Sequence, residues 1–142
     1  MAVNIKQNPD GSAGLEGTDY GAGGFVPIEI EYTASSVDKV SFVATRAYVV
    51  QAITGRVEAA GTDAGAVTAI IKKAASGTAI ASGTALHSST FNLKGTAATN
   101  QALTLSTTAT DLQIPAGTAI GIDFTGTLTS ATGVITVMLA PA

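Results

Sequence analysis

From residue 26 onward, apolar and polar side chains alternate along the chain with a period of two. In the stretch VPIEIEY, Ile28, Ile30 and Tyr32 fall on one side, and Glu29 and Glu31 fall on the other. This alternation is typical of a β-strand that buries one face and turns the other toward water or a partner. The stretch therefore predicts an amphipathic strand with its two glutamates on the outer face.

Further short segments with strand-like patterns follow, for a total of nine or ten predicted strands. They cover residues 37–44, 48–60, 66–74, 78–87, 89–94, 101–106, 111–114, 118–128 and 133–139. Turn-forming residues separate the segments, and Pro115 with Gly117 predicts a type I turn with proline second and glycine fourth. Many short strands at this spacing predict an all-β fold, an antiparallel β-sandwich for which we expect the jelly-roll form.

A helix is the main alternative to a strand at residues 63–77, because the alanines and lysines there favour a helix. Gly65 and Gly77 confine the segment, and strands flank it on both sides, so we expect a strand. The alternation in the neighbouring segments also predicts which side chains form the core. The residues expected to be buried are Ile53, Val57, Ile120, Ile122 and Phe124.

Residues 1–25 differ in composition from the rest of the chain, with six glycines between Gly11 and Gly24. Such a segment has too little apolar surface to order itself. We expect residues 1–25 to form an extended N-terminal arm, flexible or bound to a partner, ahead of a β-sandwich domain at residues 26–142. Within the arm, Leu15, Tyr20 and Phe25 are the candidate anchors for a partner.

Composition narrows the classes of function. The net charge is −3, and the seven basic residues are scattered between Lys6 and Lys94, whereas a nucleic-acid surface needs clustered Lys and Arg. We therefore expect no nucleic-acid partner. No apolar run approaches the length that spans a bilayer, and the N-terminus lacks the apolar region of a signal peptide, so we expect a soluble protein made in a cytoplasm. The absence of cysteine excludes disulfides and thiolate chemistry.

Candidate chemistry is sparse. His87 is the single histidine, and we expect it to be a strand-surface or half-buried side chain without the carboxylate neighbours of a metal site. Glu29 and Glu31 could in principle form an acid–base pair, but their place in an amphipathic strand favours a solvated or partner-facing edge. We therefore expect no catalytic residue, cofactor or metal, and no enzyme activity. With no Trp and 5% aromatic residues, the platform of a sugar-binding site is not expected either.

Lys72 and Lys73 form a short basic pair at the end of a predicted strand. The simplest interpretation is a solvated strand end. The alternative is a salt-sensitive contact with an acidic surface on a partner.

The pieces AGAVTAIIKKAASGTAIASGTAL and LQIPAGTAIGIDFTGTL, together with the Gly-rich leader, resemble the cement or decoration proteins of tailed-bacteriophage capsids, in particular their small jelly-roll members. The likeness covers about residues 26–140. It implies two facing four-stranded sheets and a structural protein on the outer surface of the virion, made in the host cytoplasm. Its partner would be the major capsid protein, whose neighbouring subunits it would cement together. The family pattern offers no catalytic or ligand residue to carry over.

Two other functions stay open at this point. One is a receptor-binding or fibre-tip module that recognises a host glycan or protein, and the other is an accessory domain of an enzyme. The lean core and the small, neutral side chains also favour association with further copies of the chain, and we expect a homo-oligomer, a dimer before a trimer.

Overall fold

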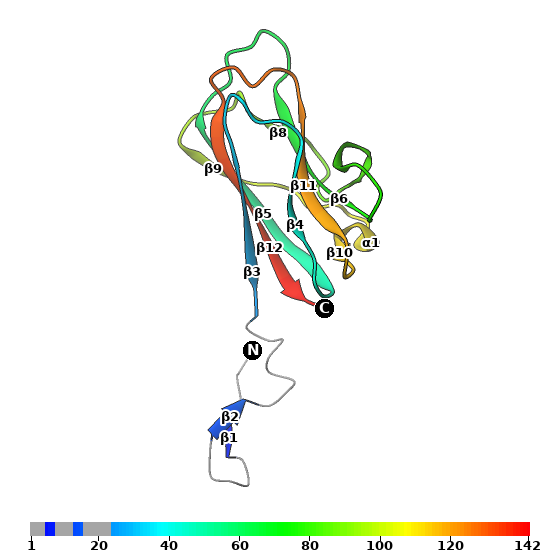
Figure 1. The fold of residues 1–142 in the computed structure, drawn as a ribbon. Helices are drawn as coiled ribbons and strands as arrows, with labels where there is room; N and C mark the ends of the chain where they lie inside the picture. Colours follow the sequence, from blue (N-terminus) through cyan, green and yellow to red (C-terminus); the bar gives the residue numbers. More distant parts are fainter. Residues whose placement is uncertain (1–4, 8–12, 16–23) are drawn as a thin grey trace.

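Two antiparallel β-sheets packed face to face account for residues 26–142 (Figure 1). The structure is a computed structural model that describes residues 5–7, 13–15 and 24–142. The first sheet, called the β12 sheet, has the order β10-β5-β12-β3, and β9 also pairs with β5. Its strands are β3 (Val26–Tyr32), β5 (Tyr48–Ala59), β9 (Thr99–Ala102), β10 (Gln113–Ile114) and β12 (Thr132–Pro141).

The second sheet, called the β11 sheet, has the order β4-β11-β6-β7, and β8 also pairs with β6. Its strands are β4 (Lys39–Val43), β6 (Thr68–Ala74), β7 (Thr84–Ala85), β8 (Phe91–Asn92) and β11 (Ala119–Thr125). Two short helical turns, η2 (Ile80–Ser82) and α1 (Ala109–Leu112), lie between strands.

The strand order is that of a jelly roll. Strands β3, β4, β5 and β6 alternate between the sheets, as do β11 and β12. The short strands β7 and β8 pair with different stretches of β6, and β9 and β10 pair with different stretches of β5. Each of these two pairs fills one strand position, so five strands occupy the four positions expected in each sheet. The predicted all-β sandwich is confirmed.

The core between the sheets follows the predicted alternation. Ile53, Val57, Ile120 and Ile122 are buried, as expected. Phe124 is only half-buried, and its expected burial is wrong. It lies near the end of β11, where its ring contacts Tyr32 of the opposite sheet edge to face and also lines a shallow pocket beside the β3–β4 turn.

Residues 68–74 form strand β6 and not a helix. This strand pairs with β11 along its whole length and with β7 and β8 on its other side. Backbone hydrogen bonds on both edges outweigh the helix preference of alanine and lysine, which is worth only a few tenths of a kcal/mol per residue.

Three local predictions need correction. Residues 78–87 were expected to be one strand, but they form η2 and the two-residue strand β7. Residues 111–114 include the end of α1 as well as strand β10. The turn after β10 runs from Pro115 to Thr118, whose N–H bonds to the Pro115 carbonyl at 3.1 Å. Gly117 is its third residue with φ +83°, as in a type II turn, and not its fourth.

Within the predicted N-terminal arm, β1 (Ile5–Gln7) and β2 (Ala13–Leu15) pair as an antiparallel two-stranded sheet. The sequence pattern did not indicate this pairing. A two-stranded sheet by itself is marginally stable in water. The expected anchor Leu15 lies in β2 opposite Ile5, and Tyr20 lies outside the described residues.

Candidate partner-binding surface

The most distinctive surface feature is a group of exposed apolar side chains that come from one short stretch of the chain. Among the described residues, the large hydrophobic side chains that are strongly exposed are Val37 (72%), Phe25 (56%), Val43 (56%) and Val40 (49%). Phe25 directly precedes β3, Val37 lies between β3 and β4, and the other two lie on β4. Exposed apolar groups on neighbouring strands mark interaction sites more often than scattered ones do.

These side chains lie along one edge of the sandwich, because β3 ends the β12 sheet and β4 ends the β11 sheet on the same side (Figure 1). The Lys39 ammonium on β4 crosses between the two sheets and donates to the Glu31 carbonyl on β3 at 2.7 Å. We call this surface the β3–β4 edge and define it by Phe25, Val37, Val40 and Val43.

A register shift explains why two valines three positions apart both point outward. Val43 lies opposite Ala119 and Phe42 opposite Ile120, but Val40, not Ser41, lies opposite Gly121. The extra residue on β4 resets the alternation, as a β-bulge does. A strict period of two would place one of these valines in the core, so the sequence pattern did not single them out. Of the four, only Phe25 was an expected anchor, and its exposed position is compatible with that role.

The two glutamates of β3 lie on the outer face of the β12 sheet. Glu29 and Glu31 are exposed, and Ile28, Ile30 and Tyr32 between and beside them are buried, as the alternation predicted. Within residues 24–142, neither carboxylate takes part in an ion pair or a side-chain hydrogen bond. Both charges are thus available to a partner, but they face away from the exposed valines of the other sheet.

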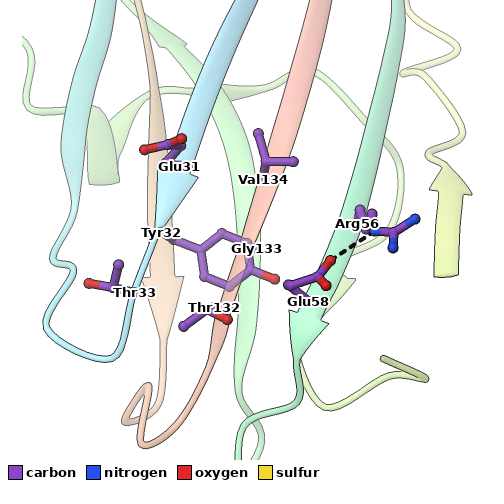
Figure 2. A pocket seen from close by; sticks show the side chains of 8 residues that line it. All are labelled: Glu31, Tyr32, Thr33, Arg56, Glu58, Thr132, Gly133 and Val134. Atoms are coloured by element: carbon purple, nitrogen blue, oxygen red, sulfur yellow. Dashed lines mark hydrogen bonds and ion pairs between the residues drawn. The ribbon is translucent and has the colours of Figure 1, made fainter. Parts of the chain in front are cut away.

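A shallow pocket of about 320 Å³ adjoins Glu31 on this face (Figure 2). It is lined by Glu31, Tyr32, Thr33, Arg56, Glu58, Thr132, Gly133 and Val134. The Arg56 Nε donates to Glu58 Oε2 at 2.9 Å, and its Nη1 donates to Asn100 Oδ1 at 3.2 Å. A guanidinium fixed in this way can bind and orient a polar ligand, whereas the lining holds no nucleophile paired with a base.

Tyr32 lies beneath this pocket and is 1% exposed. Figure 2 shows its ring beside Gly133, where an added Cβ would lie 2.4 Å from the phenol oxygen. In the described part of the chain, the Tyr32 hydroxyl is the buried side-chain polar group without a hydrogen-bond partner. Burial raises the pKa of Tyr32 to about 12, because the phenolate would be poorly solvated there.

Lys72 and Lys73 do not form the expected solvated strand end. The Lys72 ammonium forms an ion pair with Asp123 Oδ2 at 2.6 Å and donates to the Ala81 carbonyl at 2.6 Å. The Lys73 ammonium donates to the Thr110 and Gln113 carbonyls at 2.6 and 2.7 Å. Burial lowers the pKa of Lys73, and the charge of Asp111 partly opposes this. Lys72 thus ties η2 to β6, and Lys73 ties α1 and β10 to it, so a contact with an acidic partner would have to displace these bonds.

The same arrangement holds for the other two lysines of residues 24–142. Lys39 donates to Glu31, as described above, and Lys94 donates to the Asp63 and Gly65 carbonyls at 2.7 and 3.2 Å. All four ammonium groups therefore bond to backbone carbonyls of another segment. They hold these segments together, and Lys39 does so within the β3–β4 edge itself.

His87 is buried at 4% exposure, and its expected position on the surface or half-buried is wrong. Its ring nitrogens bond to backbone groups, as described below. Among the described residues, no group of three or more His, Cys, Asp or Glu side chains is placed to hold a metal ion. None of the helices in that part of the chain is long and apolar enough to span a membrane.

Comparison of the chain with protein-family models, with curated proteins and with solved structures finds no match in any of the three.

Proposed function

We propose that the protein is a structural virion protein that binds the outer surface of a phage capsid and cements neighbouring major capsid subunits. The observation that carries this proposal is the β3–β4 edge, because all the strongly exposed large hydrophobic side chains of the described chain lie on β4 or next to the ends of β3 and β4. A capsid subunit that covers this edge gains about 25 cal/mol for each Å² of apolar surface removed from water. The charged residues within this edge, Asp38 and Lys39, already bond to the protein itself, because the Asp38 carboxylate accepts the Phe124 N–H and the Lys39 ammonium donates to the Glu31 carbonyl.

The jelly-roll fold and the resemblance of residues 26–140 to capsid cement proteins support the same function. The predicted arm fits it as well. Residues 1–25 carry Leu15, Tyr20 and Phe25 among glycines. Ordering such a segment costs about 1–2 kcal/mol per residue in backbone entropy, which only an extensive partner surface can offset. A lattice of capsid subunits offers such a surface.

Co-sedimentation with capsids that lack this protein tests the role of the β3–β4 edge. The double variant Val40→Asp/Val43→Asp places two charges on the edge, and we expect at least tenfold weaker binding, about 1.4 kcal/mol. Thr54→Asp is the matched control, because Thr54 is exposed on the outer face of the other sheet. Equal binding by the wild type and the double variant would refute the assignment of this edge.

The arm is tested by removing residues 2–24. We expect the sandwich to fold without them and capsid binding to fall at least tenfold, because the anchors Leu15 and Tyr20 are lost. A circular-dichroism spectrum and an unfolding midpoint close to those of the full chain establish that the domain is intact. Equal affinity of the full and truncated chains would leave the sandwich surfaces as the sole contact.

The pocket beside Arg56 favours a second candidate, a receptor-binding module that recognises a host glycan or protein. Arg56 and Glu58 offer a fixed pair of donor and acceptor groups at the surface. If this function holds, the protein binds host cells and not capsids, and Arg56→Ala weakens that binding. For either function we expect a homo-oligomer, with a dimer before a trimer, and sedimentation velocity over a range of concentrations measures it.

A further inference from the structure

Residues 86–88 connect the two sheets on the side of the sandwich opposite the β3–β4 edge. On one side, the Leu86 N–H donates to the Ile71 carbonyl of β6 at 2.9 Å. On the other side, the Ser88 N–H donates to the Thr104 carbonyl at 2.9 Å. Residues 104–106 are anchored to the β12 sheet by the preceding residue, since the Leu103 N–H donates to the Ile53 carbonyl of β5 at 2.8 Å. We call residues 86–88 and 104–106 the closing seam, because their backbone bonds lead from the β11 sheet to the β12 sheet.

At one point of the closing seam, the His87 side chain makes a hydrogen bond that a backbone carbonyl would make in a regular sheet. In a regular antiparallel ladder the Ile71 N–H would donate to the Leu86 carbonyl. That carbonyl instead accepts the Ser106 N–H at 3.0 Å. The Ile71 N–H donates to Nε2 of His87 at 2.9 Å. The imidazole thus takes the place of a strand carbonyl beside β6.

The hydrogen bonds define the protonation state of His87. Nε2 accepts a bond from a backbone N–H and therefore carries no proton. Nδ1 lies against the Ser89 carbonyl and must be the protonated nitrogen that donates to it. A second proton could be added only at Nε2. It would abolish the bond from Ile71 and set two N–H groups against each other.

Within residues 24–142, no charged side chain on the surrounding elements is placed to stabilise the positive charge of a protonated His87 ring. On β6, Lys72 pairs with Asp123 of β11, and Lys73 bonds to backbone carbonyls. Asp111 of α1 accepts the Ser106 hydroxyl at 2.6 Å. Strands β7 and β8, η2 and residues 104–106 carry no ionisable side chain. Burial lowers the pKa of His87 from its ordinary value of 6.5, opposed only by the hydrogen bond to Ser89.

We propose that His87 is an acid-sensitive clasp of the closing seam: proton uptake releases its ring from the Ile71 N–H and opens residues 86–88 from β6. The proposal does not depend on the proposed function. Once released, the ring titrates as an ordinary histidine, so the open seam binds a proton more readily than the closed one. The clasp is therefore fully stabilising above about pH 6.5, and its stabilisation is lost as the pH falls from there toward the lowered pKa. Within this window, the population of the open seam rises about tenfold per pH unit.

Amide hydrogen exchange of the full-length protein, read by NMR between pH 7.5 and 4.5, tests this proposal. After correction for the intrinsic exchange rate, we expect protection at Ile71 and Ser88 to fall about tenfold per pH unit below pH 6.5 until the lowered pKa is reached. Amides of β12, in the other sheet, serve as the reference and should keep their protection. The ring ¹⁵N shifts of His87 should show Nδ1 protonated at neutral pH and a midpoint below 6.5.

His87→Gln is the matched variant, because its amide oxygen can accept the Ile71 N–H and does not titrate. We expect this variant to lose the pH dependence at Ile71. A flat Ile71 profile in the wild type, a His87 midpoint at or above 6.5, or the same pH dependence in the glutamine variant would each overturn the proposal. If His87→Gln does not fold, the wild-type profiles of Ile71 and the β12 amides decide the matter alone.

Discussion

Replacement of Tyr32 by phenylalanine should stabilise the protein, although Tyr32 is one of its most deeply buried side chains. The hydroxyl has no hydrogen-bond partner in the described structure, and the residue is 1% exposed. A buried hydroxyl without a partner forfeits its bonds to water, at a cost of about 1–3 kcal/mol. Tyr32→Phe removes this cost and keeps the edge-to-face contact with Phe124, whose ring centroid lies 6.2 Å away.

We expect the free energy of unfolding of Tyr32→Phe to rise by about 1–2 kcal/mol, because the cost of the unpaired hydroxyl is removed. The gain falls short of the full cost because some packing is lost with the oxygen, although the vacated space is small. For a domain of this size, each kcal/mol corresponds to a rise of about 3 °C in Tm. Chemical denaturation at pH 7, monitored by circular dichroism, measures the change. Tyr48→Phe is the control, since the Tyr48 hydroxyl is not fully enclosed, and we expect it to leave the stability almost unchanged.

The pH dependence provides a second readout of the same cause. The pKa of Tyr32 is raised from 10.0 to about 12 in the folded protein. The unfolded chain therefore loses this proton from about pH 10, whereas the folded chain retains it. Wild-type stability falls as the pH rises through this range, and the advantage of Tyr32→Phe should widen above pH 10. A variant that is less stable than the wild type at pH 7 would refute the reasoning and indicate that the hydroxyl has a partner in solution.

Two further substitutions test other parts of the structure by the same denaturation assay. Phe124→Ala should lower the free energy of unfolding by less than the roughly 3–5 kcal/mol lost with a fully buried phenylalanine, because the ring is only half-buried. A loss in that full range would mean that the end of β11 is covered in solution. Gly126→Ala should cost clearly more than Gly117→Ala, although both glycines have φ near +85°: an added Cβ at Gly126 meets the Ala66 carbonyl oxygen at 2.0 Å, whereas the space at Gly117 is open. The Gly117 variant should lose about 1 kcal/mol from backbone strain alone, and equal losses at the two sites would contradict this comparison.

The fold could be predicted from sequence because the alternation of Ile28, Ile30 and Tyr32 with glutamates, and of Ile120 with Ile122, is a local signal that burial in the sandwich reproduces. The same rule fails where the chain departs from regular pairing. The bulge at Ser41 turns Val40 and Val43 to the same side, and nothing in the period of the sequence marks it. The predicted surface therefore missed the side chains that carry the proposed function.

The polar side chains were harder to predict for a different reason. The ammonium of Lys73 bonds to the Thr110 and Gln113 carbonyls, which lie 37 and 40 residues further along the chain. A four-carbon stem can point either to water or to such carbonyls, and only the packing of α1 and β10 beside β6 decides between them. The bond of the His87 ring to the Ile71 N–H was equally hidden from the sequence, since the Leu86 carbonyl that would accept this N–H in a regular ladder is bonded to Ser106.

The edge strands of the two sheets determine whether neighbouring copies of this protein can pair through their backbones. A free strand edge is a template for fusion with another sheet, and short edge strands, bulges and lysines prevent this. Here β7, β8 and β10 are two residues long, and β9 is four. On the other side, Lys39 occupies the Glu31 carbonyl of β3, and β4 is interrupted by its bulge. Many copies can therefore lie side by side at high local concentration without merging into a continuous sheet, and their contacts are left to side chains.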